Sequence, residues 1–291
     1  MTRDAPTTRL VEVVPDLLEG LNEPTPAAIS TGFELLDFTL GGGLPLSSVT
    51  VVFGQPGVGT STLALNIATN AARADVPALV LSWETPVPET VQRVLSAVAR
   101  VPLRVIRGRV LSDDHWKSMA GSLDTVTHMP LSLAPAPDST EALRVALAAW
   151  AQDNPGPSLV VLDGPAVLAR REARSEGAWE EHSRLSATLK RMAHELGLAI
   201  VVTSPVVREA LRTGVVPRLA DVAYSPAYVT DSDVALAVHR DDLGDRESPR
   251  AGEADVLILK AKYEPSDIVT LAFQGHFARF VSLRAEPAPA T

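Results

Sequence analysis

The most chemically specific stretch of the chain is a glycine-rich segment that follows an apolar run. It reads Gly54, Gln55, Pro56, Gly57, Val58, Gly59, Thr60, Ser61 and Thr62. The spacing fits the phosphate-binding pattern G-x-x-x-x-G-K-[ST], in which glycines let backbone N–H groups turn inward around an anion. Ser61 stands where the pattern places a Mg²⁺-binding hydroxyl, but Thr60 stands where it places a lysine. The segment therefore predicts a phosphate-binding loop whose main cation is missing.

Charged residues that could complete such a site follow other apolar runs. Glu84 follows one run, Asp163 ends another, and Lys260 and Lys262 come at the end of a late one. The ends of strands are where open α/β sheets bind ligands, and an acidic residue there can order the shell of a Mg²⁺ ion. Taken singly, such an acid is more often a helix cap, and such a lysine pair a solvated strand edge. Their occurrence together with the glycine-rich loop favours a nucleotide site.

The elements that must position these residues alternate between strand and helix. Apolar runs predict strands at 48–53, 78–82, 159–163, 199–204, 233–239, 255–260, 268–273 and 277–283. Helical spacing predicts helices between them, one capped near Ser139 and one ended by Gly197. The early strands are apolar almost throughout, as in strands buried on both faces of a sheet. We therefore expect an α/β fold, with a mostly parallel central sheet flanked by helices and a C-terminal antiparallel hairpin.

The composition narrows the class of protein. The chain has 291 residues, of which 46% are hydrophobic, so it can bury a substantial core. It has no cysteine, which excludes disulfides and thiolate metal sites. A net charge of −9 speaks against a protein that coats nucleic acid with its whole surface, although not against a local basic channel. Because no signal peptide and no long apolar run is found, we expect no membrane span and a cytoplasmic protein.

The chain divides into three parts by sequence. Residues 1–28 form an N-terminal arm, in which apolar residues between 10 and 21 follow helical spacing. Residues 29–284 form the α/β domain, and 285–291 form a tail without an apolar pattern, which we expect to be disordered. The arm could fold onto its own domain or dock on a neighbouring subunit.

Short motifs follow one another along the domain in a fixed order. They are Thr31-Gly32-Phe33, Leu81-Ser82-Trp83-Glu84-Thr85, Asp231-Ser232-Asp233-Val234, His239-Arg240-Asp241-Asp242 and Ala272-Phe273-Gln274-Gly275-His276-Phe277. This succession resembles the RecA-like C-terminal motor domain of the DnaB-type replicative DNA helicases, over nearly the whole chain. Segment 10–21 is similar to the linker helix of that family, and we find no counterpart of the family's N-terminal helical domain.

The resemblance implies a P-loop NTPase that binds ATP and Mg²⁺. It also implies a homo-oligomer, expected as a hexameric ring around single-stranded DNA, which works with other replication proteins in DNA replication. By its motif, Glu84 matches the catalytic glutamate, while Ser61 and Asp163 match the Mg²⁺ ligands. Lys260 matches a lysine that a neighbouring subunit directs at the γ-phosphate, and Lys262 stands two positions on, where the family has an arginine finger.

Five residues depart from the family's pattern. Besides Thr60 and Lys262, Pro205 replaces a glutamine that links the γ-phosphate to the DNA-binding loops, and Ala223-Tyr224 replaces an Arg-Glu pair. Losing one preorganised donor to developing charge costs about 10²–10³ in rate, and an arginine finger is worth roughly 10³–10⁵. We therefore expect nucleotide binding with impaired hydrolysis.

The sequence leaves two questions open. Arg170, Arg171 and Arg174 could follow the phosphates of DNA, or they could lie in a solvated loop together with Glu172 and Glu176. The chain could be an ATP-dependent DNA helicase or translocase, or a catalytically weak nucleotide-binding module with a regulatory or assembly role. A RecA-like recombinase relative is a weaker alternative, because the C-terminal motifs argue against it.

Overall fold

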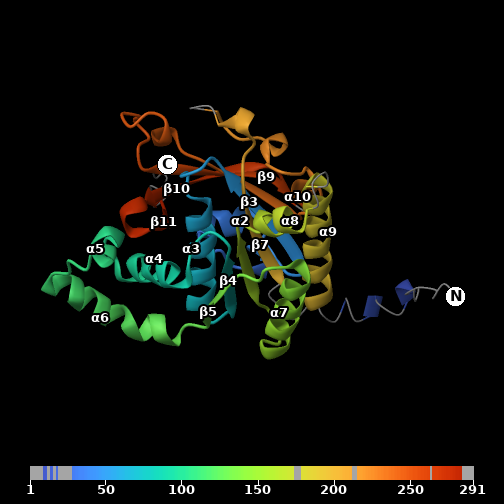
Figure 1. The fold of residues 1–291 in the computed structure, drawn as a ribbon, viewed down its shortest axis with the longest axis horizontal. Coiled ribbons are helices and arrows are strands. Elements are labelled where there is room, and N and C mark those ends of the chain that lie inside the picture. The colour runs from blue at the N-terminus through green and yellow to red at the C-terminus, as the bar shows by residue number, and fades with distance from the viewer. Residues whose placement is uncertain are drawn as a thin grey trace, which may run out of the picture.

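The computed structural model describes residues 9–11, 14–15, 18, 28–173, 178–211, 215–262 and 264–283. The predicted arm, 1–28, lies mostly outside the described residues, and the predicted tail, 285–291, lies wholly outside them. Within the described part, a nine-stranded sheet forms the centre of the molecule and helices cover both of its faces (Figure 1).

The sheet is parallel on one side and antiparallel on the other. Strands β8, β3, β7, β6, β4 and β5 pair in parallel in that order, and β9, β10 and β11 continue the sheet with antiparallel pairs beyond β8. The strands are β3 (Ser48–Gly54), β4 (Ala78–Ser82), β5 (Leu131–Pro135), β6 (Leu159–Asp163), β7 (Ala199–Pro205), β8 (Val234–His239), β9 (Glu253–Ala261), β10 (Asp267–Gln274) and β11 (Arg279–Ser282), with a separate pair β1 (Ala28–Ile29) and β2 (Leu44–Pro45).

The helices form two layers with different partners. On one face α3 packs against β4, β6 and β7, and α4 packs against α3 and β5; on the other, α9 packs against β3 and β7 and is covered by α7, α8 and α10. The helices are α2 (Glu34–Thr39), α3 (Thr60–Arg73), α4 (Val87–Ala99), α5 (Leu103–Gly108), α6 (Asp113–His128), α7 (Thr140–Asp153), α8 (Ala166–Glu172), α9 (Ala178–Leu196) and α10 (Ala227–Thr230), with short 3₁₀ turns at Arg208–Ala210, Leu219–Asp221, Asp241–Leu243 and Gly275–Phe277.

Alternation along the central strands supplies two cores. In β3, Val52 points into the core under α3, whereas Val51 and Phe53 point into the core under α9. All seven residues of β3 are buried, so this strand is covered on both faces, as its continuous apolar sequence predicts. The predicted phosphate-binding loop therefore follows a strand that is buried on both faces.

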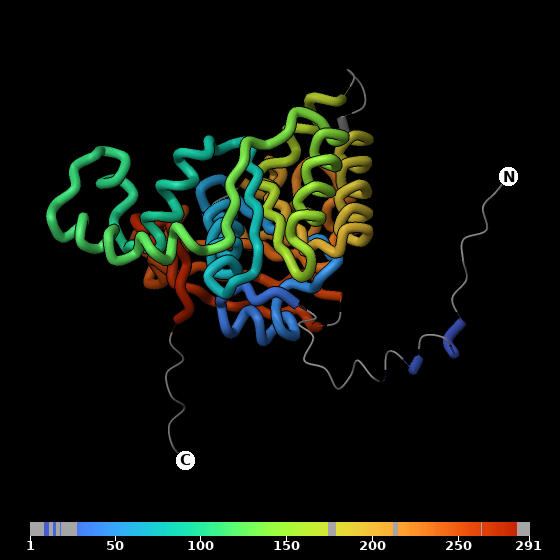
Figure 2. The backbone as a smooth tube through the Cα atoms, turned by 90° about the horizontal axis from the view of Figure 1, so that it is seen from below, coloured from blue at the N-terminus to red at the C-terminus, as the bar shows by residue number. Residues whose placement is uncertain are grey.

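Helices α5 and α6 project from the side of this body, away from α9 (Figure 2). No residue of α6 is buried, and Ser112 caps its first turn through the N–H of His115. None of the described helices is long and apolar enough to cross a membrane.

The predicted fold class is confirmed: a mostly parallel sheet flanked by helices, followed by an antiparallel C-terminal hairpin. Three strands were not predicted. β5 is an edge strand with no buried residue, and β1 and β2 have two residues each, so none carries a long apolar signal. The predicted turn at 274–276 is a 3₁₀ turn, which Ala278 closes at a left-handed φ of 50°.

Candidate nucleotide site

The phosphate-binding loop joins the end of β3 to the start of α3. Gly57 and Gly59 have φ values of +83° and +113°, in the left-handed region that favours glycine. Gly59 is the N-cap of α3, and Thr60 and Ser61 are the first residues of the helix. The first N–H groups of a helix have no partner within it, and they carry the positive end of its dipole. The loop and the first turn of α3 therefore provide backbone donors suited to an anion.

Neighbouring atoms leave no room for a side chain at Gly54 or Gly59 in the loop. A Cβ atom on Gly54 would lie 2.7 Å from Cγ1 of Val58 and 2.8 Å from the carbonyl oxygen of Val238. One on Gly59 would lie 2.9 Å from Cζ of Phe280, whose ring packs on Phe273 with centroids 4.9 Å apart. Glycine is therefore required at both positions by space as well as by spacing.

Asp163 is fixed where three neighbouring strands end. It is 6% exposed, and its two carboxylate oxygens each accept a hydrogen bond of 2.9 Å, from Ser82 Oγ and Thr203 Oγ1. These partners come from β4 and β7, which flank β6 on either side. A carboxylate held by two hydroxyls is well oriented to act as a ligand.

Ser61 and Asp163 line one small cavity of about 10 Å³ between α3 and the ends of β4 and β6. That volume is of the order of one water molecule. The sequence predicted both residues as Mg²⁺ ligands, and the structure brings them to the same place. Arg93 of α4 also lines this cavity, and no sequence motif indicated it.

Glu84 lies at the same end of the sheet, against the turn at Gly164. A Cβ on Gly164, which has φ +77°, would lie 2.8 Å from Cγ of Glu84. Loss of solvation, followed by the charge of Asp163, raises the pKa of Glu84 above its ordinary value of 4.5, and Arg170 partly offsets this. A carboxylate with a raised pKa next to a second carboxylate is typical of a functional site.

These residues fit ATP and Mg²⁺. The left-handed glycines provide a cradle that a side chain would fill, and Ser61 and Asp163 provide a hydroxyl and a carboxylate. Within the described residues, no group of three or more His, Cys, Asp or Glu could hold a metal ion. Mg²⁺ suits such a site because it is usually bound through one or two protein ligands, water and substrate phosphates.

Lys260 and Lys262 lie at the opposite end of the sheet, where β3 and β8 begin. Because β9 runs antiparallel to β8, its last residues meet the beginning of β8, and Ala261 pairs with Val234. Nζ of Lys260 donates to the carbonyl oxygens of Val229 (2.7 Å), Thr230 (3.1 Å) and Ser232 (2.5 Å). Within one chain, the two lysines therefore lie far from the loop, with the length of β3 between them and Gly54.

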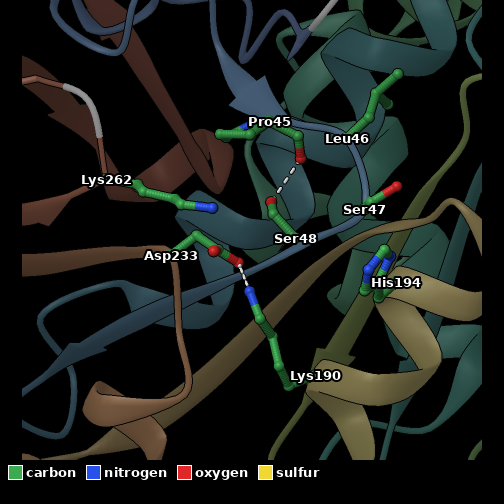
Figure 3. Close-up of a pocket in the computed structure, with 8 residues that line it drawn as sticks. All are labelled: Pro45, Leu46, Ser47, Ser48, Lys190, His194, Asp233 and Lys262. Atoms are coloured by element: carbon green, nitrogen blue, oxygen red, sulfur yellow. Dashed lines mark hydrogen bonds and ion pairs between the residues drawn. The ribbon is translucent and has the colours of Figure 1, made fainter. Parts of the chain in front are cut away.

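Lys262 lines a pocket of about 290 Å³ at that end (Figure 3). Lys190 of α9 points into the same pocket and forms an ion pair with Asp233, which also accepts the N–H of Val49 at 3.0 Å. His194 lies farther along α9 on the pocket wall (Figure 3). The pocket thus gathers cationic side chains around one buried carboxylate.

The three arginines proposed for DNA contact are only partly described. Arg170 and Arg171 lie on helix α8 rather than in a loop, and Arg174 lies outside the described residues. Arg171 forms an ion pair with Asp138, and Glu172 accepts the N–H and hydroxyl of Thr140, both at 2.6 Å. Residues 171 and 172 thereby tie α8 to the start of α7.

Arg170 reaches a different neighbour. Its guanidinium lies 5.7 Å from the ring centroid of Tyr224, which stacks on His182 at 4.7 Å with an interplanar angle of 13°. Tyr224 has a left-handed φ of 73°, which is uncommon for a tyrosine. Ala223 donates its N–H to the carbonyl of Pro205 at 3.0 Å, so the departures at 205 and 223–224 are adjacent in space.

The sequence of this chain is similar to those of known replicative DNA helicases. The sequence profile described as "DnaB-like helicase C terminal domain" matches residues 28–282. The replicative DNA helicase DnaB of Leifsonia xyli subsp. xyli is 31% identical over 282 residues, covering 96% of this chain and 61% of that protein. That of Pasteurella multocida is 30% identical over 275 residues, covering 91% and 57%. The chain therefore spans about three fifths of the length of these relatives.

Two solved structures have the same fold. One, described as an ATPase domain, matches with a TM-score of 0.87 at 21% identity, covering 96% of this chain and all of the other. A DnaB-like replicative helicase, described with its interactions with primase, matches with a TM-score of 0.85 at 22% identity, covering 96% and 68%.

Proposed function

Because the chain belongs to the DnaB-like helicase C-terminal domain family and has its RecA-like fold, we propose that it is an ATP- and Mg²⁺-binding motor domain with slow hydrolysis. One observation carries the proposal. Ser61 and Asp163 line one cavity beside the loop, and Glu84 lies close enough to Asp163 for its charge to raise the Glu84 pKa, while the loop itself has Thr60 in place of a lysine.

The side chains suggest a division of roles. Ser61 and Asp163 would hold Mg²⁺, which supplies neutralisation of phosphate charge when bound. Glu84, whose pKa is raised by burial and by the charge of Asp163, would orient and deprotonate the attacking water. The backbone donors of the loop and the start of α3 would hold the phosphates without help from a loop lysine.

The rate of hydrolysis would suffer more than binding. Removing a preorganised donor to developing charge typically costs about 10²–10³ in rate, and Thr60 supplies neither charge nor reach. Lys262 keeps the charge of the family's finger but not its planar fork. Pro205 has no side-chain group that could relay a hydrogen bond.

Assembly and DNA contact extend the proposal. We expect a hexameric ring in which Lys262 of one subunit faces the nucleotide of the next, because Lys262 cannot reach its own loop. Lys260 is a weaker candidate for that role, since its amine already donates to three carbonyls. The proposal includes single-stranded DNA in the ring, with translocation or unwinding during replication.

The decisive experiment measures binding and turnover separately. Mg²⁺-dependent ATP binding, followed by calorimetry, and DNA-stimulated ATPase activity are compared for the wild type, Glu84→Gln and Thr60→Lys. The proposal expects ATP binding in all three, slow turnover in the wild type, none in Glu84→Gln and faster turnover in Thr60→Lys. Absence of ATP binding at millimolar concentration in the wild type would overturn it.

A second function is favoured by the departures themselves. Thr60 lies in the phosphate-binding loop. Pro205 is the last residue of β7, which pairs with β3, and its carbonyl accepts the N–H of Ala223, next to Tyr224. Losses at neighbouring positions of one site suit a nucleotide-binding regulatory or assembly module without turnover. ATP affinity with no DNA-stimulated hydrolysis, and no gain in Thr60→Lys, would favour this module over the motor.

A further inference from the structure

One basic side chain lies beside the phosphate-binding loop without belonging to its motif. Arg93 is on the second turn of α4 and lines the cavity that Ser61 and Asp163 share. Among the residues that line this cavity it is the only lysine or arginine. Helix α4 packs against α3, which begins at the loop, so the position of Arg93 is set by the body of the fold.

The hydrogen bonds of Arg93 are incomplete. One terminal nitrogen donates to Oε1 of Glu89 at 3.2 Å, one helical turn earlier. Nε is buried and has no hydrogen-bond partner within the described part of the chain. A guanidinium carries five N–H donors, and a buried donor on a charged group is costly to leave unpaired. Arg93 therefore has a donor without an acceptor among the described residues.

Neither of two nearby carboxylates accepts a hydrogen bond from Nε of Arg93. Asp163 already accepts hydrogen bonds from Ser82 and Thr203, one on each oxygen. Glu89 is shared, because Arg107 also lies 3.6 Å from its Oε1. Glu89 therefore provides one carboxylate for two guanidinium groups.

We propose that Arg93 binds the terminal phosphates of a nucleoside triphosphate, and that it supplies from α4 the charge that Thr60 does not supply from the loop. The inference rests on the proposed function and deepens it. The acceptors are non-bridging phosphate oxygens, and planar N–H donors of arginine match them well. No bond is made or broken by Arg93, so its role is in binding the triphosphate.

The test is a comparison of Arg93→Gln with Arg107→Gln. Arg107 shares the same carboxylate but is 55% exposed and does not line the cavity, which makes it the matched control. Calorimetry with Mg²⁺-ATP and with adenosine is run on folded protein of equal melting temperature. The proposal expects Arg93→Gln to lower the affinity for ATP roughly tenfold to a hundredfold without changing the affinity for adenosine. Arg107→Gln should bind ATP as the wild type does.

A second background tests the link to Thr60. If Arg93 replaces the loop lysine, Thr60→Lys should restore most of the ATP affinity that Arg93→Gln loses. Should Arg93→Gln fold poorly, Arg93→Met keeps the apolar stem, removes the guanidinium and is read in the same way.

The outcomes separate this inference from the proposed function. No ATP binding in the wild type would overturn the proposed function itself. If the wild type binds ATP and Arg93→Gln binds it equally well, only the role of Arg93 is overturned. The same follows if Arg93→Gln and Arg107→Gln lose equal ATP affinity.

Discussion

At the scale of single residues, Glu84 makes stability depend on pH in a defined direction. Its pKa is raised in the folded chain, so the folded state binds this proton more tightly than the unfolded state does. The contribution is present below 4.5 and is lost as the pH rises through the raised pKa. Glu84→Gln should therefore raise the free energy of unfolding at pH 8 but not at pH 4, by less than about 1 kcal/mol because the side chain is only partly buried.

The control for this prediction has the opposite sign. The hydrogen bond from Arg144 lowers the pKa of Glu141, so Glu141→Gln should not stabilise the chain at pH 8. Thermal unfolding of both variants at the two pH values checks the pair. Equal melting temperatures for Glu84→Gln and wild type at pH 8 would contradict the assigned environment.

Gly59 gives a second prediction at this scale. Alanine there would combine a φ of +113° with a contact of 2.9 Å to Phe280. Gly156 has a similar φ of +108° with no atom within 4 Å, so Gly156→Ala measures the backbone strain alone, about 1–2 kcal/mol. Chemical denaturation should show a larger loss of unfolding free energy for Gly59→Ala than for Gly156→Ala. Comparable losses would mean that the rings of Phe273 and Phe280 move to make room for the methyl group.

How far the site could be predicted depends on how local its signal is. The loop and Glu84 come directly after apolar strands and Asp163 ends one, so the sequence predicted that they lie at the same end of the sheet. Ser61 and Asp163 do line one cavity. Arg93 and Thr203 were missed because their roles arise from packing of α4 on α3 and from pairing of β6 with β7, which no short motif encodes.

At the scale of elements, Lys260 holds the end of α10. Its amine donates to carbonyls of Val229 and Thr230 in that helix and of Ser232 just after it, and burial lowers its pKa. Lys260→Met should lower the free energy of unfolding by about 1–3 kcal/mol, because three carbonyls lose a charged donor. Lys117→Met, at a side chain that is 79% exposed, is the control and should change nothing measurable in denaturant titrations.

Strand direction explains what the sequence left out about these elements. The apolar run at 255–260 predicted a strand and placed Lys260 and Lys262 after it, but it did not indicate which end of the sheet they would reach. Antiparallel pairing with β8 puts these lysines at the end of the sheet opposite the loop. The apolar pattern of 255–260 predicts a strand, but it does not indicate which strand β9 pairs with or in which direction.

At the scale of the whole molecule, the separation of Lys262 from Glu84 makes an assembly testable. Both side chains belong to one chain, yet they lie at opposite ends of its sheet, so a site that uses both needs two subunits. Mixing Glu84→Gln with Lys262→Ala, each inactive alone, should then restore part of the ATPase activity. In a ring with equal mixing, about a quarter of the interfaces would pair an intact Glu84 with an intact Lys262.

The mixing experiment also separates a ring from independent subunits. Recovered activity should depend on protein concentration, since subunits must exchange and reassemble, and light scattering with ATP and Mg²⁺ should show an oligomer under the same conditions. A double variant carrying both changes in one chain, mixed with wild type, provides the reference for simple dilution. If the two single variants never complement while the oligomer forms, Lys262 does not act on a neighbour's nucleotide, and the cationic pocket around Asp233 serves the stability of its own subunit instead.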